Sequence, residues 1–165
     1  MKAVFDASPL IAFFQEIDSP ETLLLLRRMD YELFVPQSVF DAEIVKEPSR
    51  RLLNRFVTQG AIVLLDPLPI EVVEGFQTRY PALGPGESEA ILSAKQLLDE
   101  GSEVVCVLDE PPARKIGRRL GLPVVGTIGL IRALEKATLI AGSEARTLLA
   151  KLGSSSFRVD RKLLD

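Results

Sequence analysis

Histidine is absent from this chain of 165 residues, and cysteine occurs once, as Cys106. Without histidine the chain cannot form Ser-His-Asp or Cys-His nucleophile systems, and it lacks the usual nitrogen ligands of zinc. Cys106 lies in the apolar run VVCVLD, where a buried core thiol is expected rather than a nucleophile. A chain without disulfides fits a reducing cytoplasm. Any catalysis must therefore depend on carboxylates, lysine, hydroxyl groups or a metal ion.

Long apolar segments and a strong net charge are also lacking. The longest apolar runs, such as TLLLL and AIVLL, are much shorter than the ~20 residues of a membrane-spanning helix. Acidic residues interrupt the N-terminal segment at Asp6, Glu16 and Asp18, so we expect no signal peptide, no membrane association and a cytoplasmic location. The formal net charge of −3 predicts no general attraction to nucleic acid, which would need a local basic patch.

The order of apolar and amphipathic segments predicts an α/β fold. Short apolar runs alternate with segments of helical period, which indicates a parallel sheet covered by helices on both faces. We predict one domain, residues 1–165, built as a three-layer α/β/α sandwich with a parallel sheet of about five strands. The expected strands are 3–6, 31–36, 61–66, 103–110 and 122–127, and the expected helices are 19–29, 37–47, 49–60, 70–80, 84–101 and 112–121. A helical tail follows from Ile128, with breaks near Gly142 and Gly153, and 153–165 is a candidate flexible tail.

Carboxylates follow two of the predicted strands. Asp6 closes the first strand and Asp109 the fourth, so both are expected at the edge of the sheet where parallel α/β folds bind ligands. Glu43 falls on the inward, apolar face of helix 37–47, where a carboxylate is unfavourable unless it has a function such as binding a metal ion. As alternatives, Asp6 and Asp109 are candidate helix caps, and Glu43 is a candidate for a partly buried side chain that reaches solvent.

Two further acids, Glu87 and Glu89, lie in the first turn of helix 84–101, just after glycines. A glycine loop can approach a ligand closely, which makes both acids candidate metal ligands. The alternative explanation is that they only complement the helix dipole, which favours carboxylates in the first turn. Several carboxylates meeting at one edge of a sheet, in a chain without histidine, form an oxygen-ligand site suited to Mg²⁺ or Mn²⁺.

Four stretches of the sequence resemble the PIN domain family, in the prokaryotic branch related to VapC-type toxin ribonucleases. These stretches are VFDASPLIA, VPQSVFDAEI, LGPGESEAILSAKQL and VVCVLDEPPARKIGRRLGLPVVGTIGLI, and they come in the family's order over nearly the whole chain. The resemblance implies a parallel sheet between helices and an acidic pocket that binds Mg²⁺ or Mn²⁺ and cleaves RNA. It also implies a homodimer and a small antitoxin protein as a partner.

The resemblance gives catalytic and metal-binding roles to Asp6, Glu43 and Asp109. The acid of the later helix falls on Glu89 or Glu87, and the sequence does not decide between them.

Three more residues are candidates for supporting roles. Ser8 matches a small hydroxyl residue that hydrogen-bonds a ligand carboxylate or a metal-bound water, and a helix cap before Pro9 is the equal alternative. Glu110 follows Asp109, and Thr127 stands at the end of the fifth predicted strand, where many toxins carry an acid. The number of metal ions, and whether the chain is active, therefore stay open.

A local cluster of cations follows Asp109. Arg114 and Lys115 each have an arginine four residues later, Arg118 and Arg119, so both pairs share helix faces. We expect Arg114, Lys115 and Arg118 to bind RNA phosphates, with an ordinary solvated helix face as the alternative.

The sequence thus predicts a Mg²⁺- or Mn²⁺-dependent endoribonuclease, the toxin of a toxin–antitoxin pair. The main alternative is a non-catalytic PIN-like module that binds nucleic acid or protein. A phosphatase of another α/β type is disfavoured because Ser8 breaks the Asp-x-Asp pattern, and GPGESE does not match a phosphate-binding glycine loop.

Overall fold

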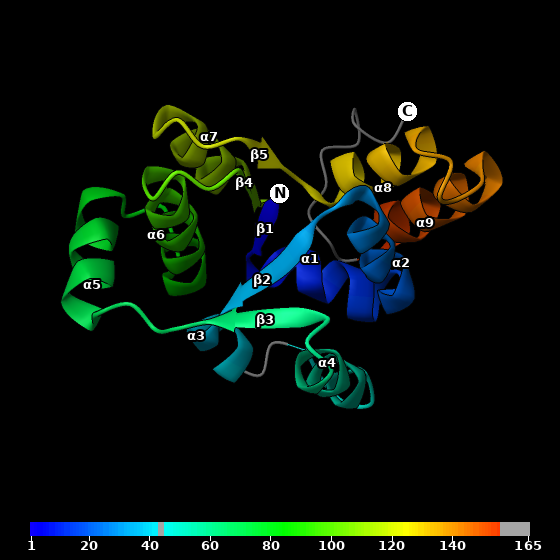
Figure 1. The fold of residues 1–165 in the computed structure, drawn as a ribbon, viewed down its shortest axis with the longest axis horizontal. Coiled ribbons are helices and arrows are strands. Elements are labelled where there is room, and N and C mark those ends of the chain that lie inside the picture. Colours follow the sequence, from blue (N-terminus) through cyan, green and yellow to red (C-terminus); the bar gives the residue numbers. More distant parts are fainter. Residues whose placement is uncertain (43–44, 156–165) are drawn as a thin grey trace.

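One parallel sheet organises the molecule in the computed structural model, which describes residues 1–42 and 45–155. Within these residues the strand order is β3-β2-β1-β4-β5, and every neighbouring pair is parallel (Figure 1). The predicted α/β class and the five-stranded parallel sheet are therefore confirmed. The strands are β1 (Lys2–Phe5), β2 (Glu32–Pro36), β3 (Ile62–Leu65), β4 (Val104–Val107) and β5 (Val124–Val125).

Alternate residues of the strands point to opposite faces of the sheet, and each face has its own core. Ala3 of β1 lies beside Leu33 of β2 and Val105 of β4, and all three belong to one buried cluster. Val4 and Cys106 are paired in the next register position and belong to the other cluster. Because β1 and β4 are covered on both faces, their sequences are apolar apart from Lys2 at the start of β1. Cys106 is fully buried, and burial raises the pKa of its thiol, as expected for a core residue.

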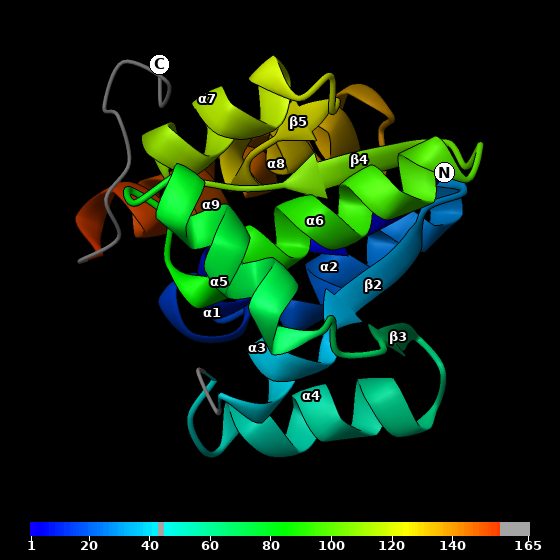
Figure 2. The same ribbon diagram turned by 90° about the vertical axis from the view of Figure 1, so that its left-hand side faces the viewer.

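Helices form the two outer layers. Figure 2 shows α5, α6 and α7 in front of the sheet, whereas α1, α2, α8 and α9 lie on the opposite face in Figure 1. The helices of the described residues are α1 (Ala7–Ile11), η1 (Ala12–Glu16), α2 (Pro20–Leu24), η2 (Leu25–Met29), α3 (Gln37–Asp41), α4 (Ser49–Thr58), α5 (Ile70–Arg79), α6 (Pro85–Asp99), α7 (Pro111–Arg119), α8 (Thr127–Lys136) and α9 (Gly142–Ser154). In the described part of the chain, no helix combines the length and apolar character that crossing a membrane requires.

The helix expected over 37–47 is shorter than predicted. It ends as α3 at Asp41, and Lys46 and Glu47 are not helical. Pro48 disfavours helical geometry at the residue before it, so the chain turns instead. The helix does not extend over 37–47 as predicted, and Glu43 itself lies outside the described residues.

The end of the described chain agrees with expectation to within a residue. The first break in the tail precedes Gly142, which begins α9, and α9 passes through Gly153 and ends at Ser154. Burial of Leu148 and Leu152 outweighs the ~1 kcal/mol that a helical glycine costs. The remainder of the candidate flexible tail, 156–165, lies outside the described residues.

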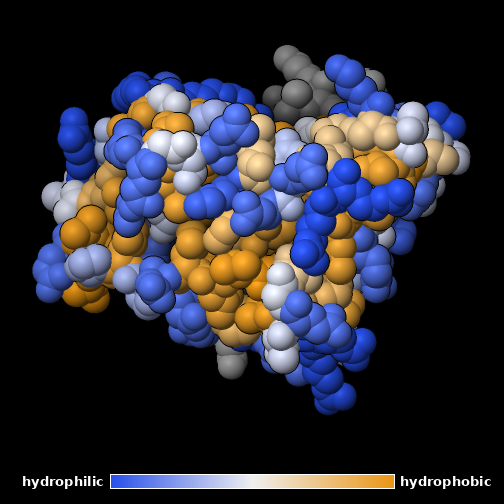
Figure 3. Space-filling model, viewed as in Figure 1, coloured by the Kyte–Doolittle hydropathy of each residue, from blue (hydrophilic) through white to orange (hydrophobic). Residues whose placement is uncertain are grey.

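The outer edge of the sheet carries apolar surface. Figure 3 shows hydrophobic side chains gathered over β2 and β3 in the middle of this face. Val63 of the edge strand β3 is 43% exposed, and Ile70 and Val72 at the start of α5 are also exposed.

Candidate functional site

The two strand-ending aspartates lie at the carboxyl ends of adjacent strands. Phe5 pairs with Val107, so Asp6 and Asp109 follow neighbouring positions of β1 and β4. The chain leaves β1 into α1 on one face of the sheet and leaves β4 into α7 on the other. Such a reversal of direction opens a crevice beyond the strand ends, where α/β proteins bind ligands. The fold thus places both acids at its most favourable ligand position.

Asp6 is almost completely buried, with 3% of its surface exposed. Burial raises its pKa from 3.8 to about 7, because a charged carboxylate loses its water. The backbone N–H groups of Ala7 and Ser8 oppose this rise, whereas the negative charges of Glu87 and Asp109 add to it. Near neutral pH, Asp6 is therefore poised between its protonated and ionised forms, and a nearby cation would ionise it.

Asp109 is held by Thr127, the first residue of α8. The backbone N–H of Thr127 donates to Oδ1 at 2.7 Å, and its hydroxyl donates to Oδ2 at 2.6 Å. Burial raises the pKa of Asp109, while both Thr127 bonds and the positive charge of Arg114 favour the ionised form. The sequence predicted that Thr127 ends the fifth strand. In the structure β5 ends at Val125, so Thr127 lies two residues beyond the strand.

Two glycines make room for these carboxylates. A Cβ atom at Gly126 would lie 2.8 Å from Oδ1 of Asp109 and would also collide with the guanidinium of Arg114. A Cβ atom at Gly86 would lie 3.2 Å from Oδ1 of Asp6. The backbone of α6 and of the turn before α8 therefore approaches the acids as closely as packing allows.

The structure separates the two acids of α6 that the sequence could not distinguish. Glu87 accepts a hydrogen bond from the backbone N–H of Gly84 at 2.7 Å, and its charge reaches Asp6. Burial, followed by the charge of Glu110, raises the pKa of Glu87, with the Gly84 bond acting in the opposite direction. Glu87 thus belongs with the acids at the ends of β1 and β4.

Glu89 faces a different part of the sheet edge. It is 5% exposed, and it accepts hydrogen bonds from the hydroxyl of Ser38 in α3 and from the backbone N–H of Leu68 at 3.2 Å. Residues two apart on a helix point in different directions, which explains the separation from Glu87. Glu89 therefore ties α6 to the segments that follow β2 and β3.

The supporting candidates divide between the acid group and its surroundings. Glu110, at the N-cap of α7, lies close enough for its charge to raise the pKa values of Glu87 and Asp109. Ser8 is half-buried in the first turn of α1, whose N-cap is Asp6, so the alternative that Ser8 caps this helix is wrong.

The donor set of the group suits a hard cation. Within residues 1–42 and 45–155, no three acidic or cysteine side chains are arranged to hold a metal ion by themselves. Mg²⁺ does not require such a cage, because it is usually bound by one or two carboxylates together with water and substrate phosphates. Asp6 and Asp109, with Glu87 nearby, supply only oxygen ligands, and burial raises the pKa of all three carboxyl groups. These residues fit Mg²⁺ or Mn²⁺.

The predicted RNA-binding cations occupy different surroundings on α7. Arg114 is half-buried over Gly126, and burial, together with the charge of Arg118, lowers its pKa, while Asp109 opposes this effect. Lys115 and Arg118 are exposed.

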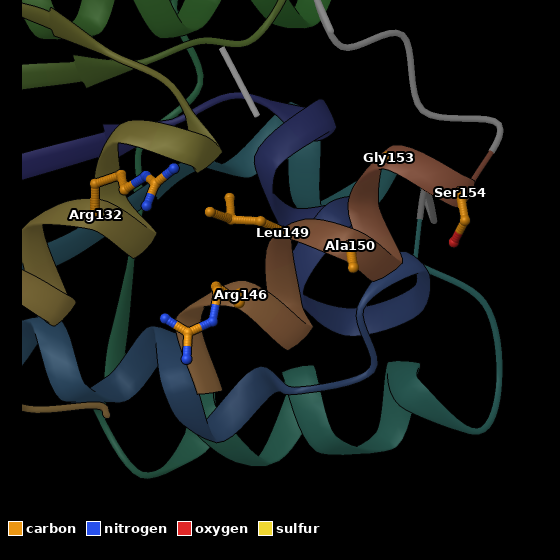
Figure 4. A pocket seen from close by; sticks show the side chains of 6 residues that line it. All are labelled: Arg132, Arg146, Leu149, Ala150, Gly153 and Ser154. Carbon is orange, nitrogen blue, oxygen red and sulfur yellow. The ribbon is translucent and has the colours of Figure 1, made fainter. Parts of the chain in front are cut away.

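A pocket of about 270 Å³ lies between the end of α5 and α7. Lys115 lines it, together with two residues that the sequence analysis missed, Arg79 and Tyr80. A tyrosine next to an arginine, just before an acid-bearing helix, was the available signal. A further cavity, of about 410 Å³, lies between α8 and α9, where Figure 4 shows Arg132 and Arg146 on either side of Leu149. None of the carboxylates described above lines it.

Comparison with known proteins gives a family and a similar solved structure. A family model described as PIN domain matches residues 2–165. A solved structure of a PilT N-terminus domain protein from the hyperthermophilic archaeon Sulfolobus solfataricus P2 is similar, with a TM-score of 0.49 and 14% identity over 81% of this chain and 92% of that chain. No curated protein matches the sequence significantly.

Proposed function

This chain belongs to the PIN domain family, and we propose that it is a Mg²⁺- or Mn²⁺-dependent endoribonuclease. Membership of the family supports a nuclease-type module. The observation that carries the finer proposal is the pair of buried aspartates, Asp6 and Asp109, at the ends of adjacent strands. The proposed substrate is RNA, and the proposed reaction is hydrolysis of a phosphodiester bond.

The residues of the chain would divide the chemistry as follows. Asp6 and Asp109 would hold the cation, with Glu87 completing its surroundings. When bound, Mg²⁺ or Mn²⁺ neutralises phosphate oxygens and makes water more acidic. Thr127 keeps the plane of the Asp109 carboxylate fixed, so both of its oxygens keep their positions. Arg114 places a planar, permanently charged group beside Asp109, where it can pair with a phosphate of the substrate.

The alternative function is a non-catalytic module of the same fold that binds nucleic acid or protein. The exposed cations of α7, Lys115 and Arg118, would serve such a module as well as they would serve a nuclease. The finer role as the toxin of a toxin–antitoxin pair depends on the resemblance in sequence.

Cleavage assays with variants distinguish the two functions. Labelled single-stranded and structured RNAs would be incubated with the protein in Mg²⁺, Mn²⁺ or EDTA. We expect metal-dependent cleavage that falls more than about 100-fold in Asp6→Asn and Asp109→Asn, since even residues that only support metal ligands are worth 10–100-fold. Asp99→Asn, which removes an exposed acid from the other end of α6, is the matched control. Equal activity of the wild type and the Asp6→Asn variant in every buffer would reject the nuclease.

A further inference from the structure

The pocket between α5 and α7 is lined by two segments that are distant in the sequence and adjacent in the structure, 79–82 and 112–119. Its volume of about 270 Å³ is near the lower limit of ~300–1,000 Å³ for small-molecule sites, which suits one nucleotide rather than several. One wall comes from the end of α5 and the loop after it, and the other comes from α7. The lining residues are Arg79, Tyr80, Pro81, Ala82, Pro112, Lys115, Ile116 and Arg119.

The charged part of the lining is entirely positive. Arg79, Lys115 and Arg119 are exposed, and none of them forms an ion pair with another described residue. Lys115 and Arg119 are four residues apart and therefore share one face of α7. In a chain with a net charge of −3, three exposed cations around one pocket, none of them ion-paired with a residue that the structure describes, indicate an anionic ligand.

The rest of the lining is flat and apolar. The ring of Tyr80 packs against Phe76, with ring centroids 4.8 Å apart, and the guanidinium of Arg79 lies 5.6 Å from the Tyr80 centroid. Pro81 and Ile116 complete the apolar surface. Aromatic rings of this kind stack on unpaired bases regardless of sequence. A site for a base beside a site for an anion matches a nucleotide.

The pocket is close to the carboxylates along both of its walls. Pro112 follows Asp109 by three residues, so the two Cα atoms are at most about 11 Å apart. Ala82, on the other wall, leads within five residues to Glu87. A nucleotide in the pocket would thus belong to the same stretch of RNA as a phosphate at Asp6 and Asp109.

We propose that this pocket binds one unpaired nucleotide of the RNA, adjacent to the cleaved bond, by stacking its base on Tyr80 and holding its phosphate with Lys115 and Arg119. The inference rests on the proposed ribonuclease function and adds the place on this chain where one nucleotide beside the cleaved bond is held. Because bases in an RNA helix are not free to stack on a protein ring, duplex RNA does not fill the pocket.

Binding measured without cleavage tests the pocket directly. The probe is a short fluorescein-labelled single-stranded RNA of mixed sequence, titrated in EDTA at several salt concentrations and followed by fluorescence anisotropy. We expect Tyr80→Ala to weaken binding about 5- to 100-fold with an unchanged salt dependence, and Tyr80→Phe to bind like wild type. Lys115→Ala and Arg119→Ala should each reduce the slope of log affinity against log salt by about 0.7.

The controls separate this proposal from a general charge effect and from the nuclease itself. Lys136→Ala removes an exposed cation at the end of α8 and should leave affinity and slope unchanged. The proposal is overturned if Lys115→Ala and Arg119→Ala behave like Lys136→Ala, or if duplex RNA binds as tightly as single-stranded RNA. Should Tyr80→Ala fail to fold, the two exposed cations decide the outcome.

A cleavage assay in Mn²⁺ keeps the two proposals distinguishable. If the wild type cleaves no RNA and the pocket variants bind RNA weakly, the result supports the pocket and rejects the nuclease. Pocket variants that bind and cleave like an active wild type would reject the pocket alone.

Discussion

Thr127 contacts both carboxylate oxygens of Asp109, through its backbone N–H to Oδ1 and through its hydroxyl to Oδ2. The two bonds fix the plane of the carboxylate, and Thr127 itself has no exposed surface. The residue after the fifth strand therefore orients an acid that follows the neighbouring strand β4.

Replacing Thr127 by valine should damage both the fold and the site. Valine keeps the shape and the backbone bond but removes a hydroxyl that donates to a carboxylate, which costs about 1–3 kcal/mol. We expect RNA cleavage to fall about 10- to 100-fold, as for other residues that orient metal ligands. Thr127→Ser keeps the donor and should retain most of the activity. Denaturant unfolding and a cleavage assay measure the two effects, and equal activity of the valine and serine variants would contradict the orienting role.

Without metal, the protein should lose stability as the pH rises towards neutrality. Asp6 has a pKa of about 7 in the folded chain and 3.8 ordinarily, so between these values the folded state holds a proton that the unfolded state has released. The stabilisation is therefore complete below about pH 4 and is lost as the pH approaches 7, and it amounts to roughly 4 kcal/mol. Asp6→Asn cannot ionise and should melt at a higher temperature than wild type at pH 8 in EDTA.

Thermal melting between about pH 5 and 8 checks this expectation. The wild-type curve should fall with pH, the Asp6→Asn curve should be flatter, and Asp99→Asn should follow the wild type. Parallel curves for wild type and Asp6→Asn would mean that Asp6 does not carry the pH dependence.

Mg²⁺ or Mn²⁺ should stabilise the folded protein. The acids around Asp6 repel one another, and a cation that binds only the folded state adds about 3 kcal/mol at one hundred times its Kd. For a chain of this length this corresponds to a rise in Tm of about 5–10 °C. Asp109→Asn should reduce the rise, and melting in the presence of EDTA provides the reference. A metal-independent Tm for the wild type would argue against a cation at these acids.

The two acids of α6 should respond differently to the same substitution. Glu87→Gln removes a charge near Asp6, so we expect a lower pKa for Asp6 and a smaller stabilisation by Mn²⁺. Glu89→Gln weakens the bonds to Ser38 and Leu68, so we expect a loss of about 1 kcal/mol with the response to Mn²⁺ preserved. Melting of both variants with and without Mn²⁺ makes the comparison, and the reverse pattern would assign the metal to Glu89.

The sequence was sufficient to predict the sheet and the placement of its two aspartates. Both follow from apolar runs that end in an acid, since a strand covered on both faces has to be apolar along its length. The choice between Glu87 and Glu89 was out of reach, because both lie in one helix turn and only their partners, Gly84 and Ser38, separate them. Gly84 is three residues before Glu87, whereas Ser38 is 51 residues before Glu89, so the second contact exists only in the fold.

Other features were missed for a related reason. Tyr80 and Lys115 line one pocket, but nothing in either segment indicates the other. The helix expected to reach Glu47 ends at Asp41, and Pro48 disfavours helical geometry at Glu47, a local effect that the apolar pattern does not reveal.

The position of Asp6 within the sheet has a consequence for motion at the site. Its backbone N–H still donates to the carbonyl oxygen of Val107 at 3.2 Å, so the backbone of this acid continues the hydrogen bonding between β1 and β4. Amides in central strands are among the slowest to exchange with deuterium, whereas loops exchange through local opening. The backbone of Asp6 is therefore expected to stay in place in the folded protein, and only rotation of its side chain can reposition the carboxylate.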